Sequence, residues 1–108
     1  MKLITAIINK RDSGEVCRCL SESGFYFTKI ATSGGFLRMG NVTLLIGTED
    51  EKVDSVIEII RNNSAQRVEA VPDAPYGESL SFIPPTPVTV PVGGATVFVT
   101  DVCHFEKM

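Results

Sequence analysis

The chain has 108 residues, which is enough for one domain with a hydrophobic core and too few for two ordinary domains. Apolar residues make up 44% of it, and 13 acidic against 10 basic residues give a formal net charge of −3. The basic residues are scattered, with Lys10-Arg11 as the longest run, so the composition argues against a surface that binds nucleic-acid polymers.

No apolar segment is long enough to span a membrane, and the apolar start at 3–8 is too short for a secretory signal. We therefore expect a cytoplasmic protein without membrane insertion. The three cysteines and the single histidine have no spacing typical of a disulfide framework or a zinc site. Reduced thiols, no metal and no cofactor are the expectation.

The first predicted elements are a strand and a helix. Residues 2–9 are apolar at both odd and even positions, which is typical of a central strand. Asp12 followed by Glu15 resembles a capping box, so the spacing predicts a helix over 13–23. Gly24 supplies the residue that ends this helix.

The middle of the chain predicts two strands and a second helix. Residues 25–32 are rich in aromatic and β-branched types, and residues 41–47 alternate in hydropathy, with a glycine-rich turn between them. Thr48 and Glu51 resemble another capping box, which opens the helix. Its buried stripe repeats at helical spacing, at Val53, Val56, Ile57 and Ile60, and the helix ends at Asn62-Asn63-Ser64.

The carboxyl-terminal part begins with a short strand at 66–71. Residues 72–87 hold five prolines and have no hydrophobic period, which predicts a long flexible loop. An edge strand follows at 88–92, because Pro91 cannot donate to a ladder. Gly93-Gly94 then predicts a tight hairpin turn into a last strand at 95–103.

This order predicts an α+β fold in a single domain over 1–108. It is a ferredoxin-like βαββαβ antiparallel sheet with an extra C-terminal hairpin strand and both helices on one face. The other face carries Ile4, Ile8, Val42 and Val97, or their alternates. Because no helix covers that apolar face, we expect self-association through it.

The densest polar and glycine-rich segment lies between the second and third predicted strands. Gly34 and Gly35 can expose backbone N–H groups to a phosphate oxygen. Phe36 offers a stacking face, and the Asn41 amide suits an adenine edge. A plain hairpin whose glycines serve the turn is the alternative, and spacing alone favours it. The apolar pair Phe36-Leu37 at a loop tip favours a ligand that covers it.

Enzymatic patterns are poorly supported. His104 is the single histidine, and no Ser-His-Asp arrangement accompanies it. The acidic run Glu49-Asp50-Glu51 is better explained by the start of a helix than by acid–base catalysis. The sequence has neither a Walker-type phosphate loop nor a Rossmann fingerprint. We therefore expect a protein that is not an enzyme.

Four stretches keep a joint spacing over essentially the whole chain. They are Met-Lys-Leu-Ile at the start, Thr28-Lys29-x-Ala31-Thr32-x-Gly34-Gly35-Phe36-Leu37-x-x-Gly40-Asn41, Ile46-Gly47-x-Glu49-Asp50, and Val92-Gly93-Gly94-Ala95-Thr96-Val97-Phe98-Val99. Together they resemble the PII-like cyclic di-AMP receptor proteins, a family of bacterial signal transduction proteins.

The resemblance implies a non-enzymatic sensor. Its expected form is a homotrimer whose sheets pack around the threefold axis, with one cyclic di-AMP in each cleft between neighbouring subunits. The loop at 72–87 corresponds to the family's long loop, which is expected to respond to the ligand and to present a surface to a regulated partner protein.

The resemblance also implies the ligand contacts. Thr28 and Asn41 are the expected polar partners of one adenine, and Gly47 leaves room because it has no side chain. The residues expected along the phosphates and ribose are Gly35, Phe36 and Leu37. Family members often carry a basic residue at the position of Tyr26. In this chain, Lys29 or Arg38 is expected to supply the positive charge of that basic residue.

Two other functions remain open at this point. A PII relative that binds ATP or ADP is one, although scattered basic residues suit a triphosphate poorly. A trimeric structural or interaction module without a nucleotide ligand is the other.

Overall fold

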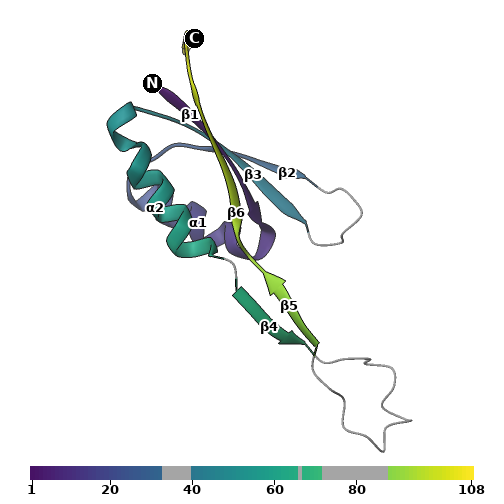
Figure 1. Cartoon of the computed structure of the whole chain (residues 1–108). Coiled ribbons are helices and arrows are strands. Elements are labelled where there is room, and N and C mark those ends of the chain that lie inside the picture. The colour runs from purple at the N-terminus through teal and green to yellow at the C-terminus, as the bar shows by residue number, and fades with distance from the viewer. Residues whose placement is uncertain (33–39, 66, 72–87) are drawn as a thin grey trace, which may run out of the picture.

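The computed structural model describes residues 1–32, 40–65, 67–71 and 88–108. In chain order the elements are β1 (Lys2–Asn9), α1 (Lys10–Glu22), β2 (Thr28–Thr32), β3 (Asn41–Thr48), the 3-10 turn η1 (Asp50–Lys52), α2 (Val53–Ser64), β4 (Arg67–Val71), β5 (Val88–Val92) and β6 (Ala95–Asp101). An antiparallel sheet has the order β2-β3-β1-β6, and β4 pairs with β5 separately (Figure 1). The α+β, ferredoxin-like fold class is confirmed.

Both α-helices cover the same face of the four-stranded sheet (Figure 1). The shared core consists of Ile4, Ala6 and Ile8 of β1, Val42, Leu44 and Ile46 of β3, Val16 and Leu20 of α1, and Val56 and Ile60 of α2. Burying each large aliphatic side chain contributes about 1.5–3 kcal/mol. Because side chains alternate along a strand, the residues between these core positions lie on the other face.

Helix α1 begins earlier than the sequence predicted. Its N-cap is Asn9, whose side-chain oxygen accepts a 2.9 Å hydrogen bond from the backbone N–H of Arg11. The capping box at Asp12 is therefore wrong, and Asp12 is a buried residue of the first turn. Gly24 follows the helix with a φ of 84°, which confirms it as the stop residue.

Helix α2 also begins differently from the prediction. Thr48 ends β3, and η1 precedes the helix without a side-chain capping bond, so the second capping box is wrong as well. The predicted apolar stripe is confirmed, because Val56 and Ile60 are buried and Val53 and Ile57 are half-buried. The helix ends at Ser64, as the polar run predicted.

The carboxyl-terminal strands pair differently from the predicted hairpin. β5 pairs with β4, whereas β6 pairs with β1 and completes the four-stranded sheet. The predicted hairpin between 88–92 and the last strand is thus wrong, as is the placement of 66–71 in the main sheet. The physical reason is β1, which needs a partner on each edge. β6 supplies apolar residues that lie beside the core, with Val97 opposite Ala6 and Val99 opposite Ile4.

The face of the sheet without helices is called the open face below. The ladder registers place on it Leu3, Thr5, Ile7, Thr28, Ile30, Asn41, Thr43, Leu45, Gly47, Thr96, Phe98 and Thr100. Ile30 is 42% exposed and Phe98 is 54% exposed. The open face therefore carries the residues that alternate along each strand with the core residues. Apolar side chains and threonines are mixed on it.

Candidate functional site

The structure places three of the six predicted ligand contacts on the open face. Thr28, Asn41 and Gly47 are all exposed there. Gly35, Phe36 and Leu37 lie outside the described residues.

These three residues do not meet at one point within the chain. Thr28 lies opposite Leu45, whereas Asn41 lies opposite Thr32. Four residue steps separate Asn41 from Leu45, which corresponds to about 13 Å along the strand. Gly47 is on the same side as Thr28 and two steps farther from Asn41. Within a single chain, Thr28 and Asn41 are therefore well separated along the sheet.

Gly47 has no structural reason to be a glycine. A Cβ built there would meet only the Cε of Met1, at the ordinary contact distance of 3.7 Å. Its φ is not positive either, since the positive values among the described glycines belong to Gly24, Gly93 and Gly94. The fold itself thus accepts a side chain at position 47, and the open space beside it is available to a ligand.

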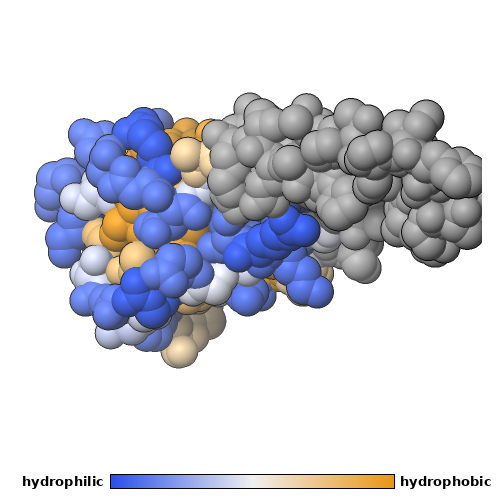
Figure 2. All heavy atoms as spheres, turned by 90° about the horizontal axis from the view of Figure 1, so that it is seen from below, coloured by the Kyte–Doolittle hydropathy of each residue, from blue (hydrophilic) through white to orange (hydrophobic). Residues whose placement is uncertain are grey.

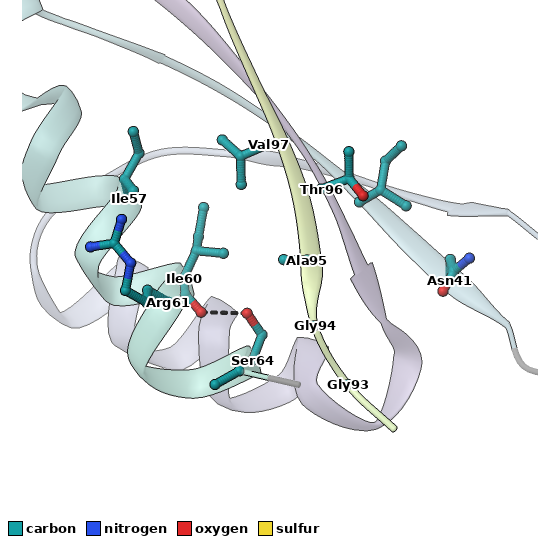
Figure 3. A pocket seen from close by; sticks show the side chains of 12 residues that line it. Asn41, Ile57, Ile60, Arg61, Ser64, Gly93, Gly94, Ala95, Thr96 and Val97 are labelled. Atoms are coloured by element: carbon teal, nitrogen blue, oxygen red, sulfur yellow. Dashed lines mark hydrogen bonds between the residues drawn. The ribbon is translucent and has the colours of Figure 1, made fainter. Parts of the chain in front are cut away.

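A cavity of about 680 Å³ lies between α2 and the start of β6. Its described lining consists of Ile7, Asn41, Ile57, Ile60, Arg61, Ser64, Ala65, Gly93, Gly94, Ala95, Thr96 and Val97. In Figure 3 the α2 residues lie on one side of β6, while Thr96 and Asn41 lie on the other. The cavity therefore follows the sheet edge, and its volume is in the range of small-molecule sites.

Asn41 is the predicted site residue that the structure brings to this cavity. Ile57 and Ile60 were expected only as core, and Gly93-Gly94 only as a turn. Sequence reasoning missed Arg61 and Thr96 as lining residues. The signal that could have found Arg61 is its helical spacing, four residues after Ile57 on the side of α2 that faces β6.

A backbone contact fixes one wall of the cavity. The N–H of Gly94 donates a 2.5 Å hydrogen bond to the carbonyl oxygen of Ser64, the last residue of α2. The Ser64 hydroxyl in turn donates to the carbonyl oxygen of Ile60, and Ser64 is buried (Figure 3). Both Gly93 and Gly94 have φ near 80°, a conformation that other residues rarely adopt. The two glycines thus serve the path of the chain into β6.

The described charges around the cavity are few. The side chain of Arg61 is 64% exposed, and its Nη1 lies 2.6 Å from Oε2 of Glu58. From below, the described surface is mainly hydrophilic, with small hydrophobic patches (Figure 2). An anionic ligand in this cavity therefore has one described cation on its lining.

Lys29 does not lie with the predicted contacts. It pairs with the core residue Leu44, so it faces the helix side of the sheet and not the open face. Burial raises the pKa of the Cys17 thiol on α1, and the nearby Lys29 charge partly opposes that rise. Lys29 of the same chain therefore does not lie on the open face to replace the family's basic residue at the position of Tyr26, and Arg38 lies outside the described residues.

The remaining chemical groups form no second constellation in the described part of the chain. Nε2 of His104 lies 2.9 Å from Oε2 of Glu106, and both side chains are exposed. Cys17, Cys19 and Cys103 are free thiols. Among the residues that the structure describes, no cluster of three or more His, Cys, Asp or Glu side chains could hold a metal ion. None of the described helices is long and apolar enough to span a membrane.

Comparison with known proteins adds a family and a fold. A family model described as "Cyclic-di-AMP receptor" matches residues 1–108. A crystal structure of a functionally unknown protein from Pediococcus pentosaceus ATCC 25745 is 38% identical, with a TM-score of 0.77. The match covers 99% of this chain and 96% of that one.

Proposed function

The chain belongs to the cyclic-di-AMP receptor family, and from this premise we propose that it is a PII-like sensor that binds cyclic di-AMP and regulates a partner protein. The observation that carries the proposal is the match of the receptor model over the entire chain. The exposed residues Thr28, Asn41 and Gly47 on one face of the sheet support it. The sensor acts by binding and not by catalysis.

The working form of the sensor is a homotrimer. The open face is the surface that three copies bury against one another, since it exposes Ile30 and Phe98 beside a row of threonines. Trimer formation also accounts for the offset of about 13 Å along the strands between Thr28 and Asn41. Thr28 and Gly47 of one subunit complete a site with Asn41 of the next.

The residues bind the ligand through ordinary polar contacts. The Asn41 amide offers a donor and an acceptor to an adenine edge, and the Thr28 hydroxyl offers one of each. The absence of a side chain at Gly47 leaves space for a ring. The proposed contacts to the phosphates are the backbone N–H groups of Gly35, Phe36 and Leu37, which lie outside the described residues.

The signal passes through the junction of α2 and β6. Gly94 and Ser64 line the cavity, and the chain leaves α2 for β4 and returns from β5 at this junction. A ligand that contacts this junction changes the position of β4 and β5 relative to the sheet. These strands flank the segment 72–87, which presents the surface that the partner protein recognises.

Calorimetric titration of the purified protein with cyclic di-AMP tests the proposal, with cyclic di-GMP and ATP as comparison ligands. We expect selective binding of one cyclic di-AMP per subunit. Binding of ATP in preference to cyclic di-AMP would show that the protein's ligand is a mononucleotide and not cyclic di-AMP. A folded trimer that binds none of the three would contradict the sensor function.

A further inference from the structure

Arg61 occupies a special place on the cavity between α2 and β6. It is the one charged residue among the described residues of the lining. Ile57, four residues earlier, and Ser64, three residues later, lie on the same side of α2 and line the same cavity. In Figure 3 the Arg61 side chain runs back along α2, so that its guanidinium lies beside Ile57. The Arg61 side chain is already part of the described lining, and it is exposed to solvent.

The present partner of Arg61 holds it weakly. The ion pair with Glu58 joins residues three apart on one helix, and both side chains are more than half exposed. Such surface pairs contribute little free energy, because water screens them and two long side chains lose rotamer freedom. Glu58 itself lines a different groove, together with Lys52 and Ile59. Arg61 can therefore exchange Glu58 for another anion at small cost.

A cyclic dinucleotide brings negative charge to a cavity whose described lining holds one cation, Arg61. The whole chain carries a net charge of −3, so its long-range field does not attract an anion. Lys29 faces the helix side of the sheet. A guanidinium presents planar N–H donors that fit a phosphate better than any other side chain.

We propose that Arg61 binds a phosphate group of the ligand by exchanging its ion pair with Glu58 for that phosphate. The inference rests on the proposed function and adds to it a residue that sets the affinity. Glu58 competes with the ligand for Arg61, so the two residues act as an exchangeable pair. Asn41 lines the same cavity. In this arrangement Asn41 contacts the adenine base of the ligand, while Arg61 contacts its phosphate.

Titration of the full-length protein with cyclic di-AMP tests this inference with Arg61→Gln and a matched control, Arg18→Gln. Arg18 is an exposed helix arginine that also pairs with a glutamate three residues earlier, Glu15, but it does not line the cavity. We expect Arg61→Gln to weaken binding roughly ten- to a hundredfold. Arg18→Gln should leave the affinity unchanged.

A gain-of-affinity variant separates binding from folding. Glu58→Gln removes the competitor of the ligand, so we expect roughly twofold tighter binding. The difference between the wild type and Arg61→Gln should also shrink as salt concentration rises, because a lost ion pair is screened. Denaturation midpoints of all three variants are measured alongside, to show that each is folded.

The outcomes distinguish this inference from the proposed function. Wild-type binding with equal affinity in Arg61→Gln would overturn the role of Arg61 and leave the sensor function standing. Weaker binding in Arg18→Gln and Arg61→Gln alike would overturn it too, since the effect would then be general electrostatics. A wild type that does not bind cyclic di-AMP would overturn the function and, with it, the inference.

Discussion

The backbone N–H of Gly94 donates a 2.5 Å hydrogen bond to the carbonyl oxygen of Ser64, so the end of α2 is joined directly to the residue before β6. Ser64 is 1% exposed and lies in the last turn of the helix, where carbonyl groups have no partner within the helix. Gly94, 30 positions later in the chain, donates its N–H to one of these carbonyl groups. Its φ is 86°. This contact joins two residues of the cavity lining and ties the chain to the end of α2 just before β6 enters the sheet.

Gly94→Ala should lower the free energy of unfolding by about 1–2 kcal/mol, because a Cβ is strained at positive φ. Chemical denaturation with urea measures the change. Gly14→Ala is the matched control, since Gly14 lies inside α1 and a Cβ there meets nothing within 4 Å. That control should raise the stability by up to about 1 kcal/mol, because alanine favours the helix. Equal effects of the two substitutions would contradict the role of the Gly94 conformation.

Gly47→Ala should leave the fold intact and weaken ligand binding. The new methyl group meets only Met1 Cε at 3.7 Å, so the free energy of unfolding should change by less than about 0.5 kcal/mol. The same methyl group occupies the space proposed for an adenine. We expect at least roughly tenfold weaker binding of cyclic di-AMP by calorimetry, since a misfitting contact readily costs about 1.4 kcal/mol. Unchanged affinity would show that the ligand does not approach position 47.

Phe98→Lys should break the proposed trimer without unfolding the subunit. Phe98 is 54% exposed on the open face of one chain, so the isolated fold does not depend on burying it. A charged group in the packed centre of a trimer leaves three like charges close together, without water. Light scattering after gel filtration should show a trimer for the wild type and a monomer for the variant.

Ser21→Lys is the control for that experiment, since Ser21 is exposed on α1. It adds the same charge on the helix side and should leave the oligomer unchanged. A wild-type protein that is monomeric at all concentrations would contradict the assembly through the open face.

The ion pair between the Met1 amino group and Asp50 predicts a pH dependence of stability. The nitrogen of Met1 lies 2.9 Å from Oδ1 of Asp50. That hydrogen bond lowers the pKa of Asp50 below its ordinary value of 3.8 and raises the pKa of the Met1 amino group above its ordinary value of 8.0. The pair is therefore fully charged in the folded protein between these two values.

The signs at the two pH limits follow from these directions. The contribution of Asp50 is present above pH 3.8 and is lost as the pH falls through its lower folded pKa. The contribution of Met1 is present below pH 8.0 and is lost as the pH rises through its higher folded pKa. Asp50→Asn should reduce the fall in melting temperature both at low pH and at high pH, when melting temperature is measured over a pH series. Parallel curves for the wild type and the variant would contradict this pairing.

The sequence predicted the local elements well because their signals are local. The alternation in 2–9 and the stripe from Val53 to Ile60 follow directly from the geometry of strands and helices. The helix starts were harder, because several polar residues compete for one cap. Asn9 caps α1 although Asp12 has the more familiar spacing to a glutamate.

The pairing of distant strands could not be predicted from such signals. Gly93-Gly94 suits a hairpin turn and a connection between two sheets equally well, since both need positive φ. The choice of β6 over β4 as the neighbour of β1 depends on packing across the whole core. The cavity was missed for the same reason, because Arg61 and Thr96 meet it only after β6 pairs with β1.

The ladder between β1 and β6 also determines when the fold can form. It joins Lys2 to Asp101, across nearly the whole chain, so a growing polypeptide lacks this partner until its last strand has been made. Until then the apolar strand β1 has an unpaired edge, which is the kind of surface that associates with other chains. Contacts between such distant residues also slow folding, because the loop must close before the contact is gained. Loss of even the few residues of β6 therefore exposes the centre of the sheet.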